Sequence, residues 1–244
     1  MSEDLKDIQF APIKDHKYAQ WFQEVRYETK MLSEAERKEF ISVMDEGIAE
    51  YSEGLSLMYE TIENSRDKHD SYHEIDYVVA SVTLFVLTTM IDCMVISKYY
   101  VCADNDYEKR FMRGKMKVIL NEGFKKLYGF EKNTHKQSEW NRLLPYMSRF
   151  PEVINYQHQR LTNLLEKHAK SSSWWKDERD LETHLDTEKL YISRQEEIID
   201  SEVMKGLMKL FDTLLAVNCF LWNLHSCLYN FLVDKYYRGE LKEE

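Results

Sequence analysis

The sequence predicts an all-α protein, an antiparallel bundle of about five to seven helices with long central and C-terminal helices. The chain has 244 residues but only seven Gly and three Pro, which is too few for the tight turns of a β-rich or doubly wound fold. Apolar side chains recur at steps of three and four residues, the period of one helix face. The 31% of charged residues suits solvated helix faces, and the 13% of aromatic residues excludes a disordered chain.

The N-terminal part is expected to be loosely attached to the rest. Residues 1–16 contain Pro12 and no helical period, so they predict an irregular arm. A short helix is expected over residues 18–30. Residues 17–244 are expected to form a single helical-bundle domain, with a candidate linker at 131–138, where the sequence is polar and shows no period.

Two Ser-x-x-Glu capping boxes, in which side chains satisfy the first backbone N–H groups of a helix, begin the next helices. The box at Ser33–Glu36 starts a helix expected to run to about Asn64. The box at Ser71–Glu74 starts a helix that is apolar nearly all round from Val78 to Val101. Its most apolar run, Val78–Ile91, is shorter than the ~20 residues of a membrane span, so we expect a buried central helix.

Three more helices are expected in the C-terminal half, each with its own boundary signal. They run from a cap at Asp104–Asp106 to a C-terminal Gly129, from Glu139 to His168 with breaks at Pro145 and Pro151, and from a third capping box at Ser193–Glu196 to about Tyr237.

Charge and cysteine usage restrict the class of protein. The formal net charge of −10 counts against general nucleic-acid binding, although it leaves room for a local basic site. The four Cys lie in apolar stretches without a Cys-x-x-Cys pair, which predicts buried, reduced thiols. The acidic N-terminus lacks the apolar region of a signal peptide, so we expect a cytoplasmic protein that does not enter a membrane. The four cysteines are Cys93, Cys102, Cys219 and Cys227.

The candidate catalytic residues are Arg179 and His184, which have four residues between them in a polar segment after Trp174–Trp175. On a helix, Asp180 and Glu188 stand four residues either side of His184 and share its face. A carboxylate beside an imidazole orients the ring and favours its protonated form, which suits proton transfer near neutral pH. The supporting residues around the pair are Asp180, Glu188, Lys176 and Arg194.

This arrangement, an Arg and a polar residue followed by a His ahead of a long C-terminal helix, resembles the HEPN superfamily over roughly residues 71–236. The resemblance implies a small helical bundle, often a homodimer, of which many members cleave RNA without a metal in toxin–antitoxin and abortive-infection systems. It implies that Arg179 binds the scissile phosphate and that His184 acts as general acid or base, with no cofactor. The family often has Asn directly after the Arg, where this chain has Asp180.

The same residues fit a second interpretation. Arg179 and His184 would then be surface residues in ion pairs with Asp180, Glu182 or Glu188, as is common where a charge-rich helix begins. The protein would be a non-catalytic helical interaction module, a degenerate relative of the family or an unrelated bundle. Its Met- and aromatic-rich surface would hold a protein partner or a second copy of the chain.

Other polar residues are assigned to the scaffold. Arg66 and His73 form another Arg–His pair, with six residues between them, in an ordinary helix–helix connection. None of the eight His follows a Glu by three residues, as the paired motifs of a di-metal bundle require, so no metal site is expected. Asp92, inside an apolar helix, is expected to need a basic partner such as Arg179. His225 is expected to be a core histidine bonded to a neighbour.

Overall fold

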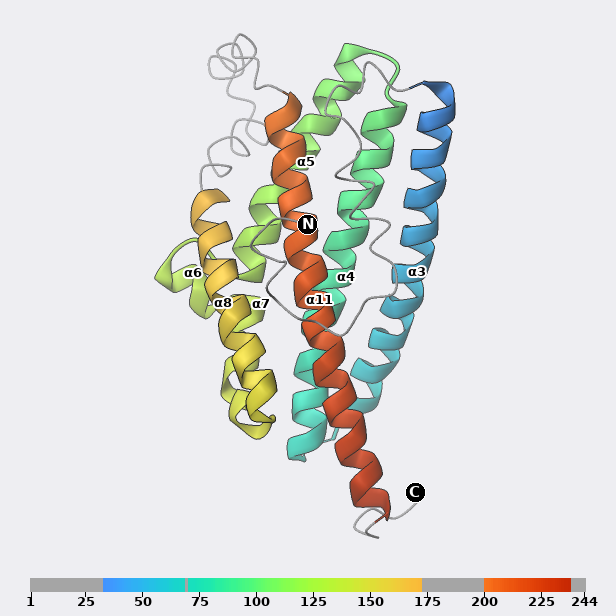
Figure 1. The fold of residues 1–244 in the computed structure, drawn as a ribbon. Helices are drawn as coiled ribbons and strands as arrows, with labels where there is room; N and C mark the ends of the chain where they lie inside the picture. The colour runs from blue at the N-terminus through green and yellow to red at the C-terminus, as the bar shows by residue number, and fades with distance from the viewer. Residues whose placement is uncertain (1–32, 69, 173–199, 238–244) are drawn as a thin grey trace.

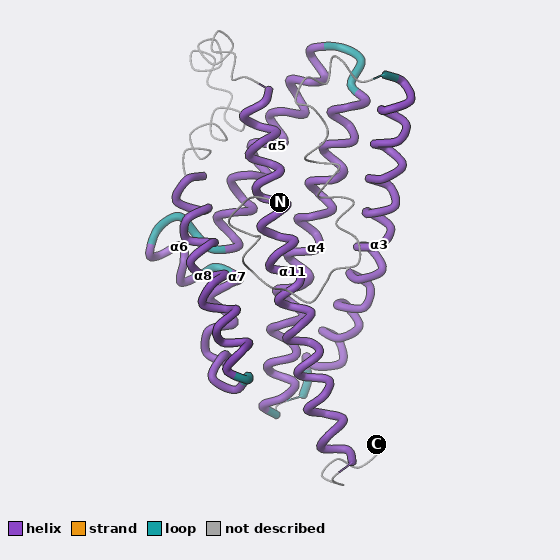
Figure 2. The backbone as a smooth tube through the Cα atoms, in the orientation of Figure 1, coloured by secondary structure: helices purple, strands orange, loops and turns teal. Residues whose placement is uncertain are grey.

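The computed structural model describes residues 33–68, 70–172 and 200–237, and every regular element in these ranges is a helix (Figure 2). The predicted all-α fold is therefore confirmed, with long central and C-terminal helices. The elements are α3 (Glu34–Arg66), α4 (Ser71–Cys102), α5 (Asp106–Leu127), α6 (Lys132–Lys136), α7 (Glu139–Leu143), the 3₁₀ helix η2 (Leu144–Arg149), α8 (Glu152–Ser172) and α11 (Asp200–Tyr237).

The long helices run alternately up and down, and α11 packs against α4, α5 and α8 (Figure 1). Helix α3 lies along the outer side of α4, away from α8. The final turns of α11 extend past the ends of its neighbours. Every residue of α11 from Leu210 to Leu221 is buried, including the polar Asp212, Thr213 and Asn218, as expected for a helix enclosed by its neighbours.

By length and composition alone, α4 and α11 are long and apolar enough to cross a membrane. The bundle already buries 61% and 83% of the residues in their apolar stretches. Contacts between helices therefore account for most of the apolar surface of both, as in the core helices of other bundles.

The helix boundaries follow the capping signals with one correction. Ser33 and Glu36 form the expected capping box of α3, and Asn105 caps α5. The box expected at Ser71–Glu74 is wrong, because α4 begins one residue earlier with Asp70 as its N-cap. The Asp70 carboxylate accepts hydrogen bonds from two backbone N–H groups at once, so Asp70 is the N-cap in place of Ser71.

Gly129 ends α5 as expected, with a positive φ of 86° and its N–H donated to the Phe124 carbonyl at 3.1 Å. The candidate linker at residues 131–138 contains the short helix α6, which its lack of an apolar period did not predict. The Thr134 hydroxyl accepts the backbone N–H groups of Phe130 and Glu131, which closes this turn of helix without any apolar period.

The predicted interruptions of the next helix are confirmed. The chain passes from α7 through η2, which holds Pro145, and α8 begins directly after Pro151. Trp140 of α7 is 1% exposed and donates its indole N–H to the Thr162 hydroxyl at 2.9 Å. Its ring stacks on His158 of α8 at 4.7 Å and contacts Phe220 of α11 at 5.4 Å. This residue therefore joins three helices.

Gly123 marks a close approach of helices α5 and α11. A Cβ at this position would lie 2.8 Å from Cδ2 of Leu210 and 3.5 Å from Cγ2 of Thr89. Since real Cβ atoms do not approach that closely, a side chain at residue 123 would require the end of the Leu210 side chain to shift.

The two polar residues expected within apolar helices, His225 and Asp92, differ in their surroundings. His225 contacts the Thr83 hydroxyl through Nε2 at 3.2 Å, and burial lowers its pKa to about 4, so it is the neutral core histidine that was predicted. Asp92 is exposed on α4, although partial burial raises the pKa of its carboxyl, and its expected partner Arg179 lies outside the described residues. Cys102 is also exposed, contrary to expectation, whereas Cys93 and Cys219 are buried and unpaired.

Candidate functional site

All the residues assigned to the predicted catalytic site lie in the sequence between α8 and α11, outside the described residues. They are Arg179 and His184 with Asp180, Glu188, Lys176 and Arg194. The expected helix over 18–30, the arm at 1–16 and the capping box at Ser193–Glu196 also lie outside the described residues.

The structure describes the two helix ends that flank this segment. His168 near the end of α8 is 2% exposed, and its Nδ1 lies 2.7 Å from the Thr213 hydroxyl of α11. That hydroxyl donates its own hydrogen to the Lys209 carbonyl, so the imidazole Nδ1 must be the donor to it. The Lys209 ammonium also donates to the Ser171 hydroxyl at 2.5 Å. The chain therefore leaves α8 from a fixed position against α11.

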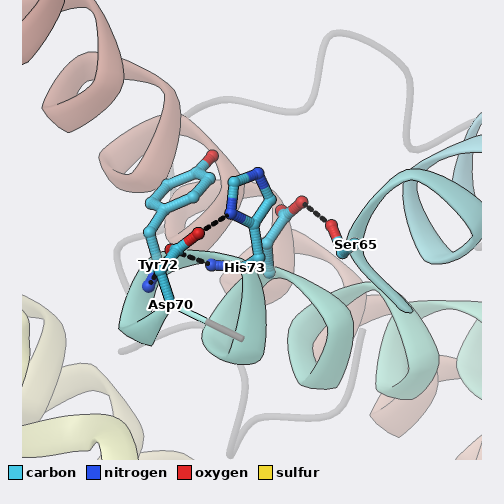
Figure 3. A network of polar contacts seen from close by, with 5 residues as sticks. Ser65, Asp70, Tyr72 and His73 are labelled. Atoms are coloured by element: carbon cyan, nitrogen blue, oxygen red, sulfur yellow. Dashed lines mark hydrogen bonds and ion pairs between the residues drawn. The ribbon is translucent and has the colours of Figure 1, made fainter. Parts of the chain in front are cut away.

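His73, from the second Arg–His pair, lies in a polar cluster at the end of the bundle where α3 meets α4 (Figure 3). One oxygen of Asp70 accepts the backbone N–H groups of Tyr72 and His73, and the other faces Nδ1 of the His73 ring. Because an ionised carboxylate only accepts hydrogen bonds, Nδ1 carries the hydrogen and Nε2 is left to exchange a proton. The His73 side chain is 25% exposed, within reach of solvent.

The electrostatics keep Asp70 ionised. Partial burial alone would raise the pKa of its carboxyl, but hydrogen bonds from His73 and Tyr72 outweigh burial and lower the pKa. Asp76, about one turn after His73 on α4, behaves in the opposite way. Burial raises its pKa, although the Ser65 hydroxyl donates to it at 2.9 Å and the charge of His73 opposes the rise. His73 thus lies between two carboxylates on one face of α4.

Aromatic rings enclose this cluster on one side. The Tyr72 ring meets the His73 ring edge-on at 5.2 Å and stacks against Phe231 of α11 at 6.5 Å. On the other side, the Tyr146 hydroxyl of η2 donates to Glu74 at 2.9 Å. Four elements therefore meet here, and sequence reasoning missed the cluster. The sequence does contain a signal for it, because Asp70 stands three residues ahead of His73 where α4 begins.

Arg66 does not complete this cluster as a catalytic partner. Its guanidinium pairs with Glu63 of the same helix at 3.3 Å, and its side chain is 59% exposed. Within the described ranges no group of three or more His, Cys, Asp or Glu side chains is arranged to hold a metal ion. What the cluster can do chemically is hold one imidazole in a fixed tautomer.

Asp70→Ala is expected to destabilise the fold by ~1 kcal/mol, within a range of about 0.5–2 kcal/mol, because two backbone donors of α4 lose their acceptor. Asp70→Asn keeps an acceptor oxygen at the N-cap and is expected to cost a smaller amount. Urea unfolding of the two variants beside the wild type measures both effects. An equal loss in the two variants would show that the charge on Asp70, and not its cap, stabilises this end of the bundle.

Comparisons of the chain with protein-family models, curated proteins and solved structures found no match. Its function is therefore inferred from the residues of the chain and from the geometry described above.

Proposed function

We propose that this protein is a HEPN-like, metal-independent helical protein that binds and cleaves RNA, in a defence or toxin–antitoxin context. The observation that carries the proposal is the Arg179-Asp180-x-x-x-His184 sequence, placed between two long helices of an all-α bundle. The contacts of Ser171 with Lys209 and of His168 with Thr213 support it, because they fix the point from which the segment departs.

The chemistry divides between two side chains. The Arg179 guanidinium binds the scissile phosphate and stabilises the charge that develops on its oxygens. His184 takes the proton from the ribose 2′-hydroxyl, whose oxygen attacks phosphorus, and a protonated group returns a proton to the departing 5′-oxygen. The products are a 2′,3′-cyclic phosphate and a 5′-hydroxyl. The decisive experiment is RNA cleavage in the presence of a chelator, compared between wild type and variants of these two residues.

A homodimer belongs to the same proposal, with the Trp174 segment in the interface. Two adjacent Trp on a helix point about 100° apart, so one can face the core while the other reaches a partner. Two copies would also place two sets of Lys176, Arg179 and Arg194 along one groove of an acidic protein.

Sedimentation at micromolar concentration is expected to give about twice the 29.4 kDa of the chain. Trp174→Ser and Trp175→Ser are the matched variants, of which one is expected to give a monomer and the other to lower the stability of the fold. A wild-type protein that sediments only as a monomer would remove the dimer and with it the shared groove.

A non-catalytic interaction module is the second candidate, because α11 carries exposed aromatic side chains toward its C-terminal end. Trp222 is 40%, Tyr229 66% and Phe231 49% exposed, and the end of α11 extends past the other helices (Figure 1). Exposed aromatic residues of this kind are enriched in protein–protein interfaces. The two candidates differ in the cleavage experiment, since an interaction module gives no cleavage that depends on Arg179 or His184.

A further inference from the structure

The charge of this chain is distributed very unevenly. Residues 109–136 carry nine Lys and Arg against two Asp and Glu, a net charge of +7. The remaining residues carry 24 and 41, a net charge of −17. Such an asymmetry is typical of a surface that binds an anionic partner within an otherwise acidic protein.

The outward face of α5 combines this charge with exposed aromatic rings. Tyr107 is 78% and Phe111 58% exposed, and the Lys115 ammonium lies 5.2 Å from the centre of the Phe111 ring. At about 100° per residue, these three side chains and the exposed Lys126 fall within about 100° of one another around the helix, an arc that Glu108 and Glu122 share. We call these four residues the α5 stripe.

The other face of α5 holds the stripe in place. Met116, Leu120 and Phe124 are fully buried in the core, and Gly123 lets α5 lie close against α11. The stripe therefore cannot turn inward without unpacking the bundle.

The charge continues from α5 onto α6, where Lys132 and Lys136 are exposed. His135 of α6 packs on Tyr128 at 4.4 Å. The Lys170 ammonium, 2.6 Å away, lowers the pKa of Glu166 on α8, and the charge of His135 adds a smaller effect in the same direction. The basic end of the stripe thus lies beside the last turns of α8. The Arg179/His184 segment follows α8 directly in the sequence.

We propose that the α5 stripe, together with Lys132 and Lys136, binds single-stranded RNA. The lysines contact successive phosphates, and the rings of Tyr107 and Phe111 stack on bases. Aromatic rings interleaved with cations favour a nucleic acid over an acidic protein, because every base offers a face to stack on whereas Asp and Glu side chains do not. The inference rests on the proposed function and specifies the surface that holds its substrate.

The test is fluorescence anisotropy of a labelled 12-nucleotide oligouridine with the full chain carrying Arg179→Ala and His184→Ala, so that cleavage does not affect the reading. Phe111→Ala is expected to weaken binding about tenfold, because one base no longer stacks on a ring. Lys115→Gln with Lys126→Gln is expected to reduce the slope of log affinity against log salt by about 1.4, or about 0.7 for each phosphate that is no longer neutralised.

Matched controls exist on the other helices. Tyr59 of α3 is 58% exposed, the same as Phe111, and Lys38 and Lys205 are exposed lysines of α3 and α11. Tyr59→Ala and Lys38→Gln with Lys205→Gln are expected to bind RNA like the parent chain. Circular dichroism melting shows whether each variant keeps the fold.

Three outcomes would overturn the proposal. The first is failure of the parent chain to bind the oligonucleotide at low salt, and the second is equal weakening by the stripe variants and their controls. The third is displacement of the RNA by an oligoglutamate peptide at equal charge concentration, which would assign the stripe to an acidic protein partner. Fluorescence anisotropy measures RNA binding by the α5 stripe, whereas the cleavage experiment tests Arg179 and His184. Either proposal can therefore fail while the other holds.

Discussion

Arg179→Ala and His184→Ala are each expected to lower RNA cleavage by about 10²-fold or more, because one removes the phosphate anchor and the other the proton-transfer group. Cleavage by the wild type is expected to persist in EDTA and to leave a cyclic phosphate end. The His184 variant is expected to change the free energy of unfolding by about 0.5 kcal/mol or less, since the segment is polar. A large loss of stability would show that His184 is a structural residue.

The substrate for this experiment is a mixed cellular RNA pool, because the acidic balance of the chain implies a narrow substrate. The matched control is the second Arg–His pair. Arg66→Ala and His73→Ala remove the same two residue types, but Arg66 pairs with Glu63 and the His73 ring is held by Asp70. Both controls are expected to cleave like the wild type. Cleavage that is equal in the wild type and in both Arg179 and His184 variants would make the interaction module the better account.

Trp140→Ala is expected to cost ~3–5 kcal/mol of folding free energy, a large part of the stability of a domain this size. The substitution leaves a cavity among α7, α8 and α11 and removes the ring that stacks on His158. The Thr162 hydroxyl loses a donor but still donates to the His158 carbonyl at 2.8 Å, so most of the cost comes from the missing packing. Urea unfolding measures the effect.

Trp222→Ala is the control for this prediction, because the substitution is the same and the side chain is 40% exposed. It is expected to cost about 1 kcal/mol or less. Similar losses in the two variants would mean that the contacts of Trp140 contribute no more to stability than those of a surface residue.

The helices could be predicted from the sequence because the long ones carry apolar residues at helical spacing, and α3, α4 and α5 each have a capping residue at the start. The side chains of Ser33 and Asn105 cap the starts of α3 and α5, and Gly129 follows the end of α5 with a positive φ. Errors arose where two local signals compete. At the start of α4, Asp70 and Ser71 could both cap, and only the folded geometry shows that the carboxylate reaches two N–H groups.

The candidate sites were harder to predict, for two physical reasons. Which side chains meet across the bundle depends on helix packing, so the contact of Tyr72 with Phe231, near the other end of the chain, carries no local signal. The α5 stripe was missed because a net charge of −10 averages over the whole chain. Charge counted in windows of one helix would have found it. The Arg179/His184 pair stays a prediction from the sequence.

The close approach at Gly123 also constrains how this sequence can diverge. A side chain at position 123 requires the end of the Leu210 side chain to move, and a bulky one requires a shorter residue at position 210 or a wider separation of α5 from α11, which would expose the buried stretch of α11. Positions 123 and 210 are therefore expected to change together in descendants of this chain. Such a coupled pair, with the Trp140 contacts, can identify a distant homologue after overall identity has faded.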